Sequence, residues 1–159
     1  TLALAAHRGV KVFAHDANPA RMKDLPDRAG RAGASVSLLD TAGVQAQAPF
    51  DLVLIDVPCS GSGSWRRAPA GKWLLTPERL EALTGTQTAI LRETAPLVSP
   101  GGVLAYATCS MLDCENSGRV RAFLSVEENW LLRFEKGWRV SAGSDGFYTA
   151  HLTRKDTAG

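Results

Sequence analysis

One continuous apolar run, Asp51–Val57 (DLVLIDV), constrains the fold most strongly. A short apolar run between turn-forming residues, without polar alternation, is typical of a central buried strand. Such strands occur in parallel sheets that helices cover on both faces. Because parallel strands need long crossover connections, we expect short strands and amphipathic helices to alternate along the rest of the chain.

The remaining patterns fit a largely parallel α/β sheet. The other predicted strands are short and apolar: 10–15, 36–39, 103–108 and, as an edge or antiparallel strand, 146–154. The longest helix is predicted at 77–98, because Thr76 can cap it and Pro77 suits its first position. A shorter helix is predicted near 115–124. Without an internal repeat or a second pattern, 1–159 is interpreted as a single domain.

Composition narrows the class of protein. Apolar residues make up 45% and charged residues 21% of the chain, which suits a packed core, and the formal charge is only +2. Because no apolar run is long enough for a membrane span, we expect a soluble, cytoplasmic protein without a membrane partner. Three cysteines without C-x-x-C spacing argue against a disulfide framework, and with three scattered histidines they predict no metal site.

Chemically useful side chains follow three of the predicted strands. In open α/β sheets, ligands bind outside the carboxyl ends of the strands. The first strand ends at Asp16, the third at Asp56 followed by Pro58 and Cys59, and the fourth at Cys109. If the third and fourth strands are neighbours, Asp56, Cys59 and Cys109 open into one crevice.

Two motifs at these strand ends, Asp56–Gly63 (DVPCSGSG) and Tyr106–Ser110 (YATCS), resemble those of the Sun-type RNA cytosine-C5 methyltransferases, especially the bacterial small-subunit rRNA enzymes. Further matching segments follow in the family's order and spacing, and together cover under half of the chain: 66–69, 72–73, 115–116 and 144–147. The resemblance implies a Rossmann-like class I methyltransferase fold, S-adenosylmethionine as cofactor, and RNA, especially rRNA, as partner.

The resemblance also implies a covalent mechanism and the residues that carry it. The thiolate of Cys109 adds to carbon 6 of cytosine, carbon 5 then takes the methyl group, and the enzyme is released with help from Cys59. Asp56 holds or protonates the ring at nitrogen 3. Because a stacked base is out of reach, the target must be unpaired or flipped out of the helix.

Binding residues are predicted with an alternative beside each. The cofactor residues that the resemblance implies are Asp16, Asp40, Asp56 and Pro58. Asp16 also suits a simple turn, and Asp40 is equally compatible with a structural role. The candidate RNA-binding cations are Arg66, Arg67 and Lys72, although charges on loops are usually just solvated. Cys114 has no matching role in the family and is interpreted as structural or incidental.

The beginning of the chain departs from the family. Thr1–Ala6 resembles the helix that follows the family's glycine-rich cofactor loop, whereas that loop, the strand before it and an N-terminal RNA-binding region are lacking. We therefore expect weak cofactor binding by this chain alone, and strand exchange, dimerisation or closure of the gap at the exposed strand edges. Two other functions stay open: a non-catalytic RNA-binding or assembly module, and a DNA cytosine methyltransferase with Cys59 as nucleophile.

Overall fold

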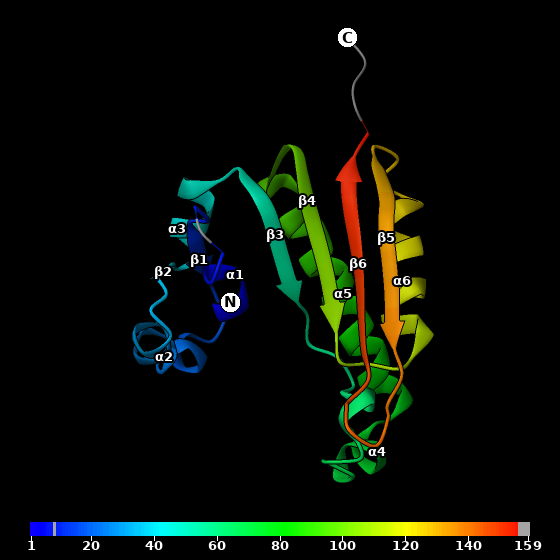
Figure 1. Cartoon of the computed structure of the whole chain (residues 1–159). Coiled ribbons are helices and arrows are strands. Elements are labelled where there is room, and N and C mark those ends of the chain that lie inside the picture. The colour runs from blue at the N-terminus through cyan, green and yellow to red at the C-terminus, as the bar shows by residue number, and fades with distance from the viewer. Residues whose placement is uncertain (8, 156–159) are drawn as a thin grey trace. The chain divides into compact units, whose positions relative to one another are not determined.

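The computed structural model describes residues 1–7 and 9–155, and the chain forms two compact units, Thr1–Ala48 and Pro49–Gly159. Figure 1 colours the first unit blue to cyan and the second cyan to red. The interpretation of the whole chain as one domain stays a prediction. None of the helices among these described residues is long and apolar enough to cross a membrane.

The first unit is built around a small parallel sheet. Its elements are α1 (Leu2–Ala5), β1 (Val12–Ala14), the 3-10 helix η1 (Pro19–Met22), α2 (Leu25–Arg31), β2 (Val36–Leu38) and α3 (Thr41–Gln47). β1 pairs with β2 in parallel, with Val12 opposite Val36. β1 is shorter than predicted because Val10 and Lys11 lie exposed before it, and the carboxylate of Asp16 starts a turn after it by accepting from the N–H of Asn18.

The second unit contains a four-stranded sheet in the order β3-β4-β6-β5. Its elements are β3 (Phe50–Asp56), η2 (Ser62–Ser64), α4 (Ala70–Leu74), α5 (Pro77–Thr94), η3 (Ala95–Leu97), β4 (Val98–Thr108), η4 (Asp113–Glu115), α6 (Ser117–Leu124), β5 (Trp130–Trp138) and β6 (Phe147–Arg154). β3 and β4 are parallel, whereas β6 is antiparallel to both β4 and β5. The sheet is therefore mixed instead of largely parallel.

The position of one strand in the sheet and the end of one helix differ from the sequence prediction for physical reasons. The strand predicted at 146–154 is antiparallel, as expected, but it is not an edge, because β5 pairs along its outer side. The long helix starts at Pro77, and the Thr76 side chain accepts from the Arg79 N–H as its cap. It ends at Thr94, four residues earlier than predicted, because a 3-10 turn containing Pro96 follows and leads directly into β4.

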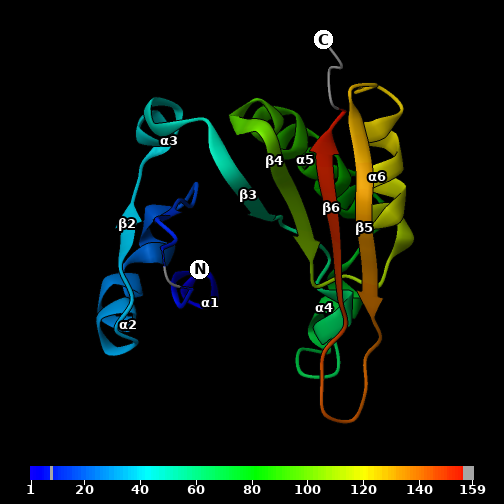
Figure 2. The same cartoon turned by 45° about the horizontal axis from the view of Figure 1, so that its top comes forward.

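The core of this unit lies between the sheet and its two long helices. Figures 1 and 2 show α5 and α6 against the same face of the sheet. Leu91 of α5, Leu104 of β4 and Leu152 of β6 are completely buried there. This packing fixes the carboxyl ends of β3 and β4, from which the candidate site is built.

β3 and the β1–β2 pair belong to separate sheets. Within the second unit, β3 ends the strand order of its sheet and has β4 as its neighbour. Leu52 and Leu54 of this strand are 44% and 47% exposed. Association through such an edge, or its closure, stays a prediction.

Candidate active site

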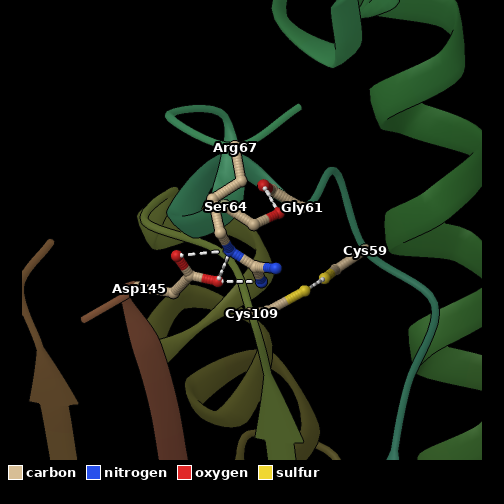
Figure 3. A network of polar contacts seen from close by, with 6 residues as sticks. All are labelled: Cys59, Gly61, Ser64, Arg67, Cys109 and Asp145. Atoms are coloured by element: carbon tan, nitrogen blue, oxygen red, sulfur yellow. Dashed lines mark hydrogen bonds and ion pairs between the residues drawn. The ribbon is translucent and has the colours of Figure 1, made fainter. Parts of the chain in front are cut away.

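Two loops that follow adjacent parallel strands bring two cysteines together. Asp56, the last residue of β3, lies opposite Ala107 of β4, so the loops after these strands leave the same edge of the sheet. The sulfurs of Cys59 and Cys109 lie 3.4 Å apart across the two loops (Figure 3). Both cysteines are half-buried, while Cys114 is exposed on η4. The expected juxtaposition of the two thiols is therefore present, whereas their catalytic roles stay predictions.

The environment of Cys59 keeps its thiol protonated. Burial, as the largest effect, and the neighbouring Cys109 raise the pKa of Cys59 to about 12, although a backbone hydrogen bond at Gly61 acts in the opposite direction. With that pKa, Cys59 is almost entirely a thiol at pH 7. Cys59 can therefore act as the hydrogen-bond donor towards the sulfur of Cys109.

The carboxylate of Asp56 lies at the same end of the sheet. Asp56 is exposed at the end of β3, three residues before Cys59. Pro58 between them is exposed as well, and its carbonyl accepts from the side-chain amide of Gln87 at 2.9 Å. Helix α5 therefore holds the backbone of the segment that carries both Asp56 and Cys59.

A completely buried carboxylate, Glu115, connects the two cysteine loops from behind. Its Oε1 accepts from the Ser60 N–H at 2.8 Å and from the Gln87 amide at 3.0 Å. Its Oε2 accepts from the hydroxyls of Ser60 and Ser110. In the sequence, Glu115 stands only within the family resemblance and at the start of the helix predicted near 115–124, whereas in the structure it ends η4, before α6. The available signal was the place of this acidic residue in a motif segment between a turn and a helix. That signal marks Glu115 as a candidate for a role at the site, but it does not indicate its partners.

Asn116 and Ser62 complete the hold on the second loop. The Asn116 side chain accepts from the Thr108 hydroxyl at 2.6 Å and donates to the carbonyl of Ser110 at 2.9 Å. The Ser62 hydroxyl accepts from the Met111 N–H at 2.7 Å. The loop that presents Cys109 is thus fixed on both sides of the cysteine.

The two glycines of the first motif are required for different reasons. Gly61 has a φ of +68°, a left-handed conformation that glycine adopts without strain. Gly63 is needed for space: a Cβ there would lie 2.2 Å from the carbonyl oxygen of Gly146 and 2.9 Å from that of Cys109. Gly63 therefore allows the two loops and the residue before β6 to approach one another backbone to backbone.

The loop before β6 is tied to the same place by an ion pair. Arg67 forms a bidentate contact with Asp145, whose carboxyl group is buried (Figure 3). Hydrogen bonding to Arg67 lowers the pKa of Asp145 below its ordinary value. Of the three predicted RNA-binding cations, Arg67 is thus paired with Asp145, while Arg66 and Lys72 are exposed. Trp73, 80% exposed, lies beside Lys72, with the ammonium 5.5 Å from the ring centre.

The predicted cofactor residues fall into both units. Asp16 and Asp40 follow β1 and β2 and line one hollow of the first unit. The other side chains of this hollow are mainly apolar, among them Ala17, Pro19, Met22, Leu38 and Leu39. Each carboxylate uses Oδ1 to accept a backbone N–H, from Asn18 and Gly43 respectively. The other two predicted cofactor residues, Asp56 and Pro58, belong to the second unit.

The chain is similar to known methyltransferases both in its fold and in its sequence. The chain has the fold of Rossmann-like, S-adenosylmethionine-dependent methyltransferases: NSun6 from Pyrococcus horikoshii, in a crystal structure with SFG, superposes with a TM-score of 0.77 at 22% identity over 92% of this chain and 42% of that one. Residues 1–153 match the family model of the 16S rRNA methyltransferase RsmB/F. The chain belongs to this family of RNA methyltransferases.

Curated relatives agree with that assignment. The ribosomal RNA small subunit methyltransferase B of Salmonella arizonae is 34% identical over 158 residues, covering 91% of this chain and 37% of the relative. The corresponding enzyme of Cronobacter sakazakii is 47% identical over 114 residues, covering 67% of this chain and 27% of the relative. The chain thus spans well under half of the length of these relatives.

Proposed function

We propose that this chain is the catalytic portion of an enzyme that transfers a methyl group from S-adenosylmethionine to carbon 5 of a cytosine in RNA, with rRNA as the substrate and the cytoplasm as its place of action. The observation that carries the proposal is the 3.4 Å contact between the sulfurs of Cys59 and Cys109 on two motif loops. A single buried cysteine is usually a small core residue, whereas two thiols that meet at the carboxyl ends of adjacent strands suit covalent chemistry.

Cys109 is the nucleophile in this proposal. Its thiolate forms a bond to carbon 6 of the cytosine, and the ring electrons move towards carbon 5 and nitrogen 3. The carboxyl group of Asp56 holds a proton at nitrogen 3, which accepts that charge. S-adenosylmethionine, when bound, would supply the electrophilic methyl group that carbon 5 takes and would leave as S-adenosylhomocysteine. Nitrogen 3 then returns its proton to Asp56.

Cys59 acts in the release of the product. The proton of carbon 5 passes to solvent, the bond between carbon 6 and Cys109 breaks, and its electrons return to the Cys109 sulfur. Because the raised pKa of Cys59 keeps it a thiol, its S–H donates to that sulfur and stabilises the departing thiolate. The division of roles therefore follows the two motifs, with the S–H of Cys59 close enough to donate to the sulfur of Cys109.

The predicted binding residues have suitable surroundings. The hollow with Asp16 and Asp40 combines an apolar wall with two carboxylates, which fits the base and the ribose hydroxyls of an adenosine. Asp56 and Pro58, in the second unit, are the other two residues that the family resemblance assigns to the cofactor. Arg66 and Lys72 offer charge for phosphates, and the exposed ring of Trp73 offers a surface for a base, whereas Arg67 first has to leave Asp145.

Covalent trapping tests the proposal. The chain replaces the matching segment of the Salmonella arizonae relative, which supplies the rest of an enzyme of that family. The chimera is incubated with S-adenosylmethionine and RNA that contains 5-azacytidine, which blocks release of the enzyme. We expect a protein–RNA adduct that survives denaturation, is lost in Cys109→Ser, and persists in Cys59→Ser and in the control Cys114→Ser.

The alternative functions predict other results. A nucleophilic Cys59, as in DNA cytosine methyltransferases, gives an adduct that is lost in Cys59→Ser and persists in Cys109→Ser. A non-catalytic RNA-binding module gives RNA binding without an adduct, although the folded chimera binds the cofactor. Either pattern contradicts the assignment of Cys109.

A further inference from the structure

We infer that Glu115 is a positioning residue that sets the separation of the two cysteine sulfurs. The inference takes the cysteine pair of the proposed function as its starting point and assigns the device that holds the pair. It depends on where the partners of this carboxylate lie in the chain. Ser60 directly follows Cys59, and Ser110 directly follows Cys109, so Glu115 binds the residue next to each thiol.

The two oxygens of the carboxylate divide the work. Oε1 accepts two N–H groups, from the backbone of Ser60 and the amide of Gln87. Oε2 accepts the two serine hydroxyls, which also contact one another at 3.3 Å. Because Gln87 donates to Pro58 as well, helix α5 holds the first loop both directly and through Glu115.

The complete burial of the Glu115 carboxylate costs desolvation free energy, which its hydrogen bonds have to offset. Glu115 is 0% exposed, and a carboxylate out of water is tolerated only when hydrogen bonds surround it. The backbone of the same residue is fixed too, since its carbonyl accepts from the Tyr106 hydroxyl at 2.6 Å. Glu115 therefore has a fixed position relative to β4, and its hydrogen bonds to Ser60 and Ser110 fix both cysteine loops to that position.

Other contacts join the loops farther from the sulfurs. The Gly63 N–H donates to the Cys109 carbonyl, and Ser62 contacts Ser110 and Met111. These contacts keep the loops folded when Glu115 is replaced. Ser60 then keeps contacts within its own loop, from the Ser62 N–H and the Trp65 indole, and its hydroxyl reaches the second loop through the 3.3 Å contact with Ser110. Loss of the carboxylate should therefore leave a folded chain in which Cys59 and Cys109 meet less often.

The test measures how strongly the two thiols favour each other. In the 159-residue chain with Cys114→Ser, equilibration with reduced and oxidised glutathione gives the effective concentration of Cys59 towards Cys109. We expect Glu115→Ala to lower this value at least about tenfold. Glu115→Gln should stay within about threefold, because its carbonyl keeps the two N–H donors while the serine hydroxyls turn to accept from its amide.

Matched controls separate positioning from stability. Asp113→Asn removes an exposed carboxylate two residues earlier, and Leu152→Val weakens the core away from the loops. Both should keep the parent's effective concentration, whatever their effect on the free energy of unfolding. If Glu115→Ala behaves like Leu152→Val, less stable but with unchanged thiol pairing, Glu115 is merely structural and the inference is overturned.

A second variant keeps the question decidable if Glu115→Ala does not fold. Ser60→Ala with Ser110→Ala leaves the carboxylate and its two N–H donors and removes both hydroxyl links. It should lower the effective concentration about threefold or more, and an unchanged value contradicts the inference. Because the readout needs neither RNA nor cofactor, failure of methyl transfer does not affect it: normal thiol pairing without a 5-azacytidine adduct contradicts the proposed function alone.

Discussion

Replacing Gly63 by alanine should damage the site and the fold together. The new Cβ would lie 2.2 Å from the carbonyl oxygen of Gly146, 2.7 Å from its carbon and 2.9 Å from the carbonyl oxygen of Cys109. All three neighbours are backbone atoms, so no side chain can turn aside. The loops after β3 and β4 and the loop before β6 must therefore move apart.

The expected loss follows from two contributions. Overpacking in a tight site costs about 1–3 kcal/mol. The movement also strains two backbone hydrogen bonds of 2.9 Å, from the Gly63 N–H to Cys109 and from the Gly146 N–H to Gly63, each worth about 1 kcal/mol. We expect the free energy of unfolding to fall by about 3–5 kcal/mol, which shifts the urea midpoint by about 1.5–2.5 M for an m-value of about 2 kcal/mol per M.

Tryptophan fluorescence is the appropriate assay, because all four tryptophans lie in the second unit: Trp65, Trp73, Trp130 and Trp138. Urea unfolding is followed with a reductant present. Gly85→Ala is the matched control, since Gly85 lies inside α5 with nothing near its Cβ position, and alanine there should stabilise by about 1 kcal/mol. Equal or higher stability of Gly63→Ala than of the parent chain would refute the close backbone packing.

Three further outcomes are expected. Hydrogen bonding to Arg67 lowers the pKa of Asp145, so the ion pair stabilises the folded chain at pH values above the ordinary carboxyl pKa. This stabilisation is lost as the pH falls through the lowered pKa of Asp145. Asp145→Asn should therefore be less stable than the parent at pH 7 in urea titrations, and the difference should vanish towards about pH 2. Because the pKa of Cys59 is about 12, it holds about a thousandfold less thiolate at pH 8 than a thiol of pKa 9.0; iodoacetamide should modify the exposed Cys114 well before it, as peptide mass spectrometry can show. Thr76→Ala removes the cap of α5 and should cost about 1 kcal/mol in the same fluorescence assay, whereas an unchanged midpoint contradicts the capping contact.

The sequence predicted the parts of the fold that depend on local pattern. The run Asp51–Val57 predicts a strand, and β3 occupies Phe50–Asp56. The expected central, buried position was wrong, because β3 ends the strand order of its sheet and Leu52 and Leu54 are exposed, whereas Ile55 is buried. The cap at Thr76 and the start of α5 were readable for the same reason: a cap depends on residues that are adjacent in sequence. Edge strand β5 was not predicted. Only Trp130 among its residues is buried, and the other residues show no clear alternation of apolar and polar side chains.

The site was predictable to the extent that motifs follow strands. Two motifs after neighbouring strands placed Cys59 and Cys109 together, which required only the pairing of β3 with β4. The role of Gly63 was not accessible, because it depends on Gly146, which is distant in sequence. The burial of Glu115 depends on partners from α5 and both loops, and a sequence pattern gives no such meeting point.

The most direct measurement is the disulfide map of the folded chain after brief treatment with diamide, a thiol oxidant. The two sulfurs 3.4 Å apart should join, so peptides containing Cys59 and Cys109 appear linked and Cys114 stays free. Chain entropy alone favours the opposite result by about thirtyfold, because Cys109 is 50 residues from Cys59 but only about five from Cys114. A Cys109–Cys114 link in the folded chain, or two unlinked thiols at 59 and 109, would contradict the meeting of the two loops on which the proposed methyl transfer depends.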